Sequence, residues 1–185
     1  MRVWKMEIKL KGLVDEDVVN YRKTSMFIIF PSCDFKCEKE CGRAVCQNSS
    51  LAQAPVLSYD DKEIIKRYID NPLTHAIVIG GLEPFYSITS MEQVCALVSL
   101  LRDDYGCLDD VVIYTGYTEA ELTGEKEGLS IIQQHLFQNL IETPNIIIKF
   151  GRYRPDDVSH YDSVLGLNLA SLNQYAKRYN TIENN

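Results

Sequence analysis

Residues 26–48 read MFIIFPSCDFKCEKECGRAVCQN, an apolar run followed at once by a cysteine-rich loop. Four of the six cysteines of the chain fall within this loop. Thiolates gathered on a loop at the end of a strand are ligands for thiophilic centres, which are zinc or iron–sulfur clusters. The segment therefore predicts a buried strand at Met26–Phe30 that leads directly into a metal site.

The spacing of these cysteines distinguishes the two kinds of centre. Structural zinc sites usually take their ligands from two C-x2-C-type pairs. Cys33, Cys37, Cys41 and Cys46 are separated by intervals of three, three and four residues, so that no C-x2-C pair is among them. We therefore expect an iron–sulfur cluster rather than zinc.

Length, composition and charge exclude several classes of protein. With 185 residues, 45% of them hydrophobic, the chain can bury one core, and a single domain is expected. A formal charge of −7 and a pI near 5.0 argue against binding to nucleic acid. No apolar stretch is long enough to span a membrane, and the N-terminus lacks the apolar segment of a secretory signal, so a cytoplasmic protein is expected.

Apolar runs rich in β-branched residues recur along the chain and alternate with helical patterns. Short runs of this kind are typical of buried parallel strands, and strand–helix–strand repetition implies a mainly parallel sheet. Functional groups should then gather where the strands end. The expected strands are Met26–Phe30, Ala76–Ile79, Val111–Tyr114 and Ile146–Phe150.

Helical patterns occupy the segments between these strands. A helix is expected over Tyr59–Asp70, opened by a capping box at Ser58 and Asp61, and another over Met91–Tyr105, ended by Gly106. Further signals are a cap at Thr118 with Glu121 and an apolar stripe at Ile131, Ile132, Leu136 and Leu140.

Two further segments give the chain a family resemblance. Gly80-Gly81-Leu82-Glu83-Pro84 follows the second strand, and with the cysteine loop after the first it resembles the radical S-adenosylmethionine (SAM) enzymes. Within that superfamily, Ile113–Thr118 and Leu169–Gln174 are similar to segments of the activating protein of anaerobic ribonucleotide reductase. The resemblance runs from about Val19 to Arg178.

The resemblance implies a fold and an activity. The fold is a partial, open (β/α) barrel of α/β class, forming one radical SAM domain over residues 1–185 with its core at about 19–178. The activity is reductive cleavage of SAM by a [4Fe–4S] cluster to install a glycyl radical on a partner enzyme. The implied partners are a glycyl-radical enzyme such as anaerobic ribonucleotide reductase and an electron donor such as flavodoxin.

The cysteine loop departs from the pattern of the superfamily, which is C-x3-C-x2-C. Cys33 and Cys37 fit the first interval, but Glu40 stands where the third cysteine belongs. Cys46 is followed two residues on by Asn, as the third cysteine of the family often is, which makes residues 38–45 an insertion. The implied cluster ligands are therefore Cys33, Cys37 and Cys46, with Cys41 as the alternative third ligand. Ligation by all four would leave no iron open to SAM.

The residues that correspond to the family's cofactor contacts lie at the ends of the second and third expected strands. The resemblance implies that Gly80, Gly81, Glu83 and Pro84 meet the methionine part of SAM, with Thr115 and Gly116 as further contacts. Glycine lets the backbone approach closely, proline stiffens the turn, and a carboxylate accepts from an ammonium group. At the end of the fourth strand the chain has Lys149, where the family often has an acidic residue.

Two other functions fit the same motifs. One is a radical SAM enzyme that acts on a small molecule, similar to the compact 7-carboxy-7-deazaguanine synthase. The other is a non-catalytic interaction module in which all four clustered cysteines bind a metal. Cys95 and Cys107 lie apart from the cluster loop and are expected to be core or surface thiols.

Overall fold

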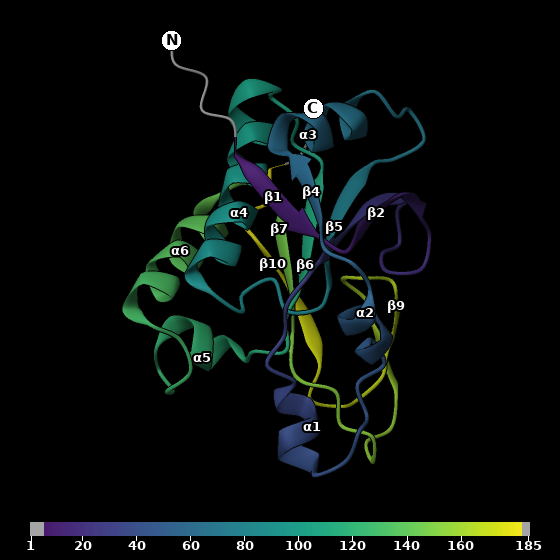
Figure 1. Cartoon of the computed structure of the whole chain (residues 1–185), viewed down its shortest axis with the longest axis vertical. Coiled ribbons are helices and arrows are strands. Elements are labelled where there is room, and N and C mark those ends of the chain that lie inside the picture. The colour runs from purple at the N-terminus through teal and green to yellow at the C-terminus, as the bar shows by residue number, and fades with distance from the viewer. Residues whose placement is uncertain (1–5, 183–185) are drawn as a thin grey trace.

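A computed structural model describes residues 6–182 and shows a mixed α/β fold around a six-stranded sheet (Figure 1). The strand order is β10-β7-β6-β5-β3-β2, in which β3, β5, β6 and β7 are parallel and the two edge strands are antiparallel to their neighbours. The four parallel strands are those expected from the sequence. The bounds are Gly12–Asp17 for β2, Ser25–Phe30 for β3, Ala76–Gly81 for β5, Asp110–Tyr114 for β6, Ile146–Phe150 for β7 and Tyr175–Tyr179 for β10.

The four parallel strands are continuous apolar runs because both faces of the sheet are covered. Every residue of β7 is buried, as are the first five of β5. The sheet is open, since β2 and β10 each pair with one neighbour and not with each other, and no closed barrel forms within residues 6–182. The mainly parallel sheet is thus confirmed.

Helices cover one face of the sheet and enclose the larger part of the core (Figure 1). Phe137 lies at its centre, where its ring contacts those of Phe85 and Phe150 edge-on. The helices are α3 (Asp61–Ile69), α4 (Ile88–Ser99), which continues into a π-helical turn (Leu100–Asp104), α5 (Glu119–Thr123) and α6 (Ile131–Glu142). None of the helices between residues 6 and 182 has the length and apolar character needed to cross a membrane.

The opposite face is covered by a small hairpin of β8 (His160–Asp162) and β9 (Leu167–Leu169). Leu165 and Leu169 from this hairpin pack with Tyr21 and with the outward residues of β5, β6 and β7. The cysteine-rich loop contains two short helices, α1 (Lys36–Cys41) and α2 (Ser49–Gln53). In Figure 1, α2 lies on the side of β9, and α1 lies below the lower ends of the strands. A separate two-stranded sheet pairs β1 (Glu7–Leu10) with β4 (Leu57–Asp60).

Two expectations about the helices are wrong. Ser58 does not cap α3, because residues 57–60 pair with β1 and the cap is Asp60, whose carboxylate accepts from the amides of Lys62 and Glu63. Ile131 and Ile132 are exposed, because the first turn of α6 extends beyond the core that Phe137 and Leu140 enter. By contrast, the cap of Thr118 with Glu121 and the stop at Gly106, whose φ is +60°, are confirmed.

Candidate functional site

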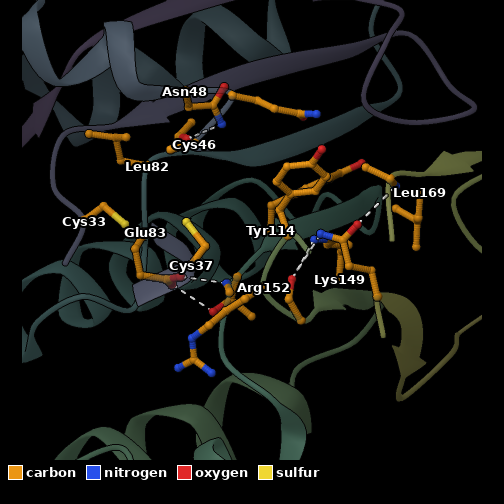
Figure 2. Close-up of a pocket in the computed structure, with 18 of the residues that line it drawn as sticks. Cys33, Cys37, Cys46, Asn48, Leu82, Glu83, Tyr114, Lys149, Arg152 and Leu169 are labelled. Carbon is orange, nitrogen blue, oxygen red and sulfur yellow. Dashed lines mark hydrogen bonds between the residues drawn. The ribbon is translucent and has the colours of Figure 1, made fainter. Parts of the chain in front are cut away.

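The loops that follow the four parallel strands surround one cavity of about 540 Å³ (Figure 2). The cysteine loop follows β3, Gly81–Glu83 ends β5, Tyr114–Tyr117 ends β6 and Lys149–Tyr153 ends β7. The carboxyl ends of parallel strands meet at one edge of a sheet, which explains why segments far apart in sequence converge here. The size is that of a site for a small molecule.

Three of the four clustered cysteines line this cavity. Cys33, Cys37 and Cys46 all face it, although eight residues lie between the last two in the chain. The intervening segment folds back because α1 ends at Gly42, with φ +67°, and the Glu38 carboxylate accepts a hydrogen bond from the Cys46 amide at 3.0 Å. Residues 38–45 therefore return the chain to the first two cysteines.

The other three cysteines lie outside the cavity. The Cys41 thiol donates to the Glu38 and Arg43 carbonyls at 3.7 and 3.4 Å, within its own loop. Cys95 lies in α4 with its thiol 3.8 Å from the Leu136 carbonyl, and Cys107 follows the π-helical turn. The geometry thus separates Cys41 from the three thiols that share the cavity.

Burial makes the thiols of Cys33 and Cys37 weaker acids. Desolvation raises the pKa of Cys33 to about 12, and it also raises the pKa of Cys37, with a further contribution from the neighbouring Cys46. Neutral thiols exchange their protons for metal when a centre binds, so the binding of a cluster would be coupled to proton release. The Cys33 sulfur already accepts the Phe35 amide at 3.3 Å, a contact that favours the thiolate.

The three cavity cysteines are a donor set that suits an iron–sulfur cluster. In the part of the chain that the structure describes, no three His, Cys, Asp or Glu side chains converge closely enough to hold one metal ion. Cys33, Cys37 and Cys46 face one cavity, and cysteine thiolates are the ligands that hold [4Fe–4S] clusters.

The end of β5 is held close to the cysteine loop. Gly81 has φ +85°, and a Cβ there would lie 2.5 Å from Ile29 Cγ2, so the close passage of β3 and β5 requires glycine. The Asn48 side-chain amide donates to the Gly81 carbonyl at 2.7 Å, and the Glu83 amide donates to the Ser32 carbonyl at 2.8 Å. The residue two positions after Cys46 therefore anchors the cysteine loop to the β5 turn.

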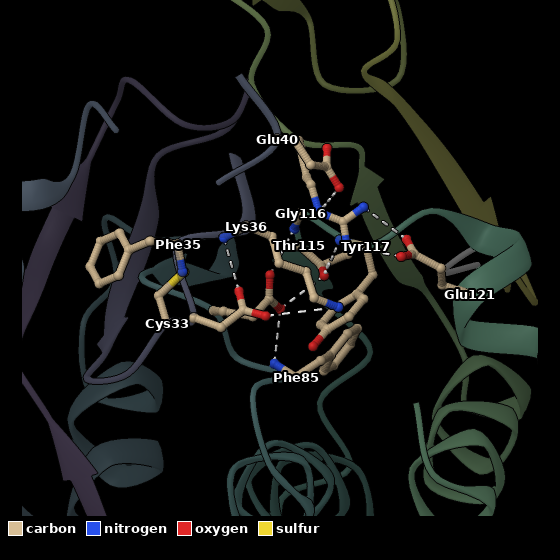
Figure 3. Close-up of polar contacts among 12 residues, drawn as sticks. Cys33, Phe35, Lys36, Glu40, Phe85, Thr115, Gly116, Tyr117 and Glu121 are labelled. Atoms are coloured by element: carbon tan, nitrogen blue, oxygen red, sulfur yellow. Dashed lines mark hydrogen bonds and ion pairs between the residues drawn. The ribbon is translucent and has the colours of Figure 1, made fainter. Parts of the chain in front are cut away.

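Glu83 is buried, lines the cavity (Figure 2) and connects the β5 and β6 turns through Phe85, Thr115 and Gly116, which Figure 3 labels. Its Oε1 accepts from the Phe85 amide at 3.0 Å and the Thr115 hydroxyl at 2.8 Å, and its Oε2 accepts from the Gly116 amide at 2.8 Å. Burial outweighs these bonds and raises the pKa of Glu83 to about 7. A carboxylate has about four acceptor sites, so these three bonds leave one on Oε2 for a cationic ligand.

The sequence-predicted cofactor residues divide into two groups. Gly81, Glu83, Thr115 and Gly116 line the cavity, whereas Gly80 and Pro84 are not among its lining residues. Gly80 belongs to the sheet, where a Cβ would lie 3.2 Å from that of Tyr114. Its small size serves the packing of β5 against β6.

A cation–aromatic cluster at the cavity wall was not expected from the sequence. Arg152 forms two hydrogen bonds to the Glu121 carboxylate, at 2.9 and 3.1 Å, and its Nε lies 3.4 Å from Glu40. The Tyr117 ring lies 5.0 Å from the Lys36 ammonium and 5.5 Å from the Arg152 guanidinium. Because Glu40 and Lys36 belong to α1, this cluster ties the cysteine loop to the ends of β6 and β7. The one signal for it in the sequence is the short group of basic residues Lys149, Arg152 and Arg154.

Residues 171–174, in the segment that resembles the activating-protein family, form hydrogen bonds to the turn after β7. The side-chain amide of Asn173 donates to the Arg152 carbonyl at 2.8 Å, and that of Gln174 donates to the Gly151 carbonyl at 3.2 Å. The Ser171 hydroxyl accepts from the Arg154 amide at 3.2 Å. The segment therefore positions the cavity wall, and Gln174 also lines it.

A comparison with protein families decides the class of the site. The model of the 4Fe-4S single cluster domain family matches residues 22–154, well over half of the chain. The chain belongs to this family. The 4Fe-4S single cluster domain contains the cysteine loop and the ends of all four parallel strands, so an iron–sulfur cluster is its indicated metal centre. Searches of curated proteins and of solved structures gave no match.

Proposed function

We propose that this 4Fe-4S domain is a radical SAM enzyme whose cluster is held by Cys33, Cys37 and Cys46. The observation that carries the proposal is that these three thiols, and not Cys41, share a cavity with the Gly81–Glu83 turn. Three ligands leave one iron without a protein donor, which is what chelation by SAM requires. When bound, the cluster would supply the electron that cleaves SAM.

The chain's own residues would bind and orient the cofactor. Glu83 retains an acceptor site toward the cavity, where it suits the amino group of SAM. The Gly81 backbone can approach the ligand closely, and the Tyr117 ring offers an apolar surface at the end of β6. Thr115 and Gly116 are held by Glu83, so they would shape the site through the same carboxylate.

The proposed substrate is a glycine residue of a partner, in a glycyl-radical enzyme such as anaerobic ribonucleotide reductase, with a flavodoxin-like electron donor. Support comes from the Tyr114–Tyr117 and Ser171–Gln174 segments, which resemble the activating-protein family. The first lines the cavity, and the second contributes Gln174 to the lining and hydrogen-bonds to the turn after β7. The domain would then act in the cytoplasm as a small activase.

A small-molecule substrate is the second candidate. The observation that favours it is the cavity itself, which has a volume typical of small-ligand sites and is lined on one side by Leu167–Ala170 of the C-terminal hairpin region. The four-cysteine module is less well supported, because Cys41 donates to carbonyls of its own loop.

Anaerobic reconstitution followed by reduction in the presence of SAM tests the proposal. We expect 5′-deoxyadenosine to form, and a glycyl doublet to appear in the electron paramagnetic resonance (EPR) spectrum when a cognate reductase is added. A reductase with its target glycine replaced by alanine is the control. Formation of 5′-deoxyadenosine without a doublet would favour an enzyme that acts on a small molecule. Absence of 5′-deoxyadenosine under every condition would refute the radical SAM proposal.

A further inference from the structure

Lys149 is a buried cation that neither the cluster nor the proposed SAM contacts use. It ends β7, its exposed fraction is 7%, and it lines the cavity. Figure 2 draws it beside Tyr114 and Leu169, with Cys33 and Cys37 in another part of the view. A lysine is almost never so deeply buried without a partner of opposite charge, because removing the ammonium from water is costly.

The protein itself supplies little to balance this charge. Within residues 6–182 no carboxylate forms an ion pair with Lys149, and its one hydrogen bond goes to the Gly151 carbonyl at 3.0 Å. That carbonyl also accepts from Gln174, which occupies its second lone pair. Two of the three ammonium donors therefore remain for a partner in the cavity.

The other groups near Lys149 compensate only in part. The Tyr114 ring lies 5.8 Å from the ammonium, and Glu83 acts on it through space while its own carboxylate is bound to Thr115 and Gly116. Burial lowers the pKa of Lys149 to about 8, against the opposing effect of Glu83. The ammonium form is still favoured at neutral pH, so a positive charge faces the cavity.

We infer that Lys149 binds a carboxylate group of a ligand in the cavity. A carboxylate matches the free donors of the ammonium and neutralises its charge, and a charge-assisted bond of this kind is stronger in a buried site than in water. Two molecules could supply the carboxylate: SAM, through its methionine part, or a substrate bound beside it. Only the SAM assignment rests on the proposed function.

Binding measurements distinguish the two sources. Equilibrium dialysis of the reconstituted protein with SAM and with decarboxylated SAM compares wild type with K149M. K66M is the matched control, because Lys66 is an exposed lysine that pairs with Asp70 on α3. Cluster content measured on each sample checks that the variants fold. If SAM supplies the carboxylate, K149M weakens SAM binding tenfold or more and leaves the affinity for decarboxylated SAM unchanged.

A footprint on the unmodified wild-type side chain covers the second source and does not depend on a variant. The holoprotein is treated with acetic anhydride, and the acetylation rate of Lys149 is read by mass spectrometry with and without SAM and sodium acetate. If a substrate supplies the carboxylate, SAM affinity is the same in wild type and K149M, and acetate slows acetylation of Lys149 while SAM is bound.

The inference is overturned if K149M binds SAM and decarboxylated SAM as tightly as wild type does and acetate does not slow acetylation of Lys149. It is also overturned if K66M weakens SAM binding as much as K149M does. These measurements report binding rather than SAM cleavage. A protein that binds no SAM would therefore refute the proposed function, while acetate protection alone would still decide the role of Lys149.

Discussion

Asp110 and Glu83 are both buried carboxyl groups, 5% and 7% exposed, at opposite ends of the parallel strands. Asp110 begins β6 and is surrounded by donors: the Arg178 guanidinium, the Lys23 ammonium at 2.7 Å and the Tyr21 hydroxyl at 2.8 Å. Burial opposes ionisation, but these bonds lower the pKa of Asp110 to about 2.

Glu83 receives only neutral donors, so burial dominates and raises its pKa to about 7. Lys149 and Cys33 line the same cavity, and burial favours their neutral forms as well, because it lowers the pKa of Lys149 and raises that of Cys33. One end of the sheet therefore pairs its buried charge, while the other leaves several ionisable groups unmatched. Strongly perturbed, unmatched groups in a cavity are typical of functional sites, because a ligand completes them.

The largest expected effect is loss of the cluster, and it tests whether the cavity end is the metal end. After anaerobic reconstitution, Cys46→Ala should lose most of its iron and sulfide, whereas Cys41→Ala should retain both. The reason is that the Cys46 thiol faces the cavity and the Cys41 thiol does not. Cys33→Ala and Cys37→Ala should behave as Cys46→Ala does. Iron and sulfide assays on the four variants make the test, and retention by Cys46→Ala with loss by Cys41→Ala would reverse the assignment.

A second prediction concerns the close backbone approach that forms the cavity end. Gly81→Ala should destabilise the protein by about 2–4 kcal/mol, since its Cβ would clash with Ile29 and φ is +85°. Gly106→Ala is the control, because φ is +60° there but no atom lies within 4 Å of the added Cβ. It should cost only about 1–2 kcal/mol. Urea unfolding measures both, and equal losses would show that the approach at Gly81 is not tight.

At the paired end, Asp110→Asn should cost about 1–3 kcal/mol of unfolding free energy, because it removes the charge that Arg178 and Lys23 share. The same urea titration, repeated at high salt, should leave most of this loss in place, since screening is weak for a buried group. A loss below about 0.5 kcal/mol would mean that the network contributes little to stability.

The smallest expected effect is a pH dependence of opposite sign at the two ends. Folded Glu83 holds its proton more tightly than the unfolded chain does, so its contribution to stability should fall as pH rises from about 4.3 to about 7. Folded Asp110 holds its proton less tightly, so its contribution should be lost as pH falls from about 4 to about 2. Each contribution should change by on the order of 1 kcal/mol per pH unit within its window.

Stability differences between wild type and Glu83→Gln, and between wild type and Asp110→Asn, isolate these two contributions in the cluster-free protein. Thermal unfolding followed across pH 2–8 provides the curves. A Glu83 difference that does not vary with pH would mean that its carboxyl group has an ordinary pKa, and the contrast between the two ends would then fail.

The sequence predicted the centre of the molecule better than its edges. The four parallel strands were predictable because burial on both faces leaves them continuously apolar, as in β7. The edge strands β2 and β10 are more polar and were not predicted, and the polar β4 strand displaced the expected cap of α3 from Ser58 to Asp60. Local patterns do not reveal which polar segment finds a partner.

The site was predictable where it depends on chain order and unpredictable where it depends on side-chain contacts. Cysteines after β3 and Gly81–Glu83 after β5 had to meet, because parallel strands end at one edge. That the Glu38 carboxylate returns Cys46 to the cavity, and that Arg152 binds α5 and α1, follows from long-range contacts without a sequence signal. Lys149 was noted as unusual, but its burial required the hairpin that covers the sheet.

The central claim is that three cysteines hold the cluster and leave one iron open to SAM. The EPR spectrum of the reduced, reconstituted protein, recorded with and without SAM, tests it most directly. We predict that SAM changes the g-values of the cluster signal in wild type and in Cys41→Ala alike. An identical spectrum with and without SAM, from protein shown to contain a full cluster, would contradict the account.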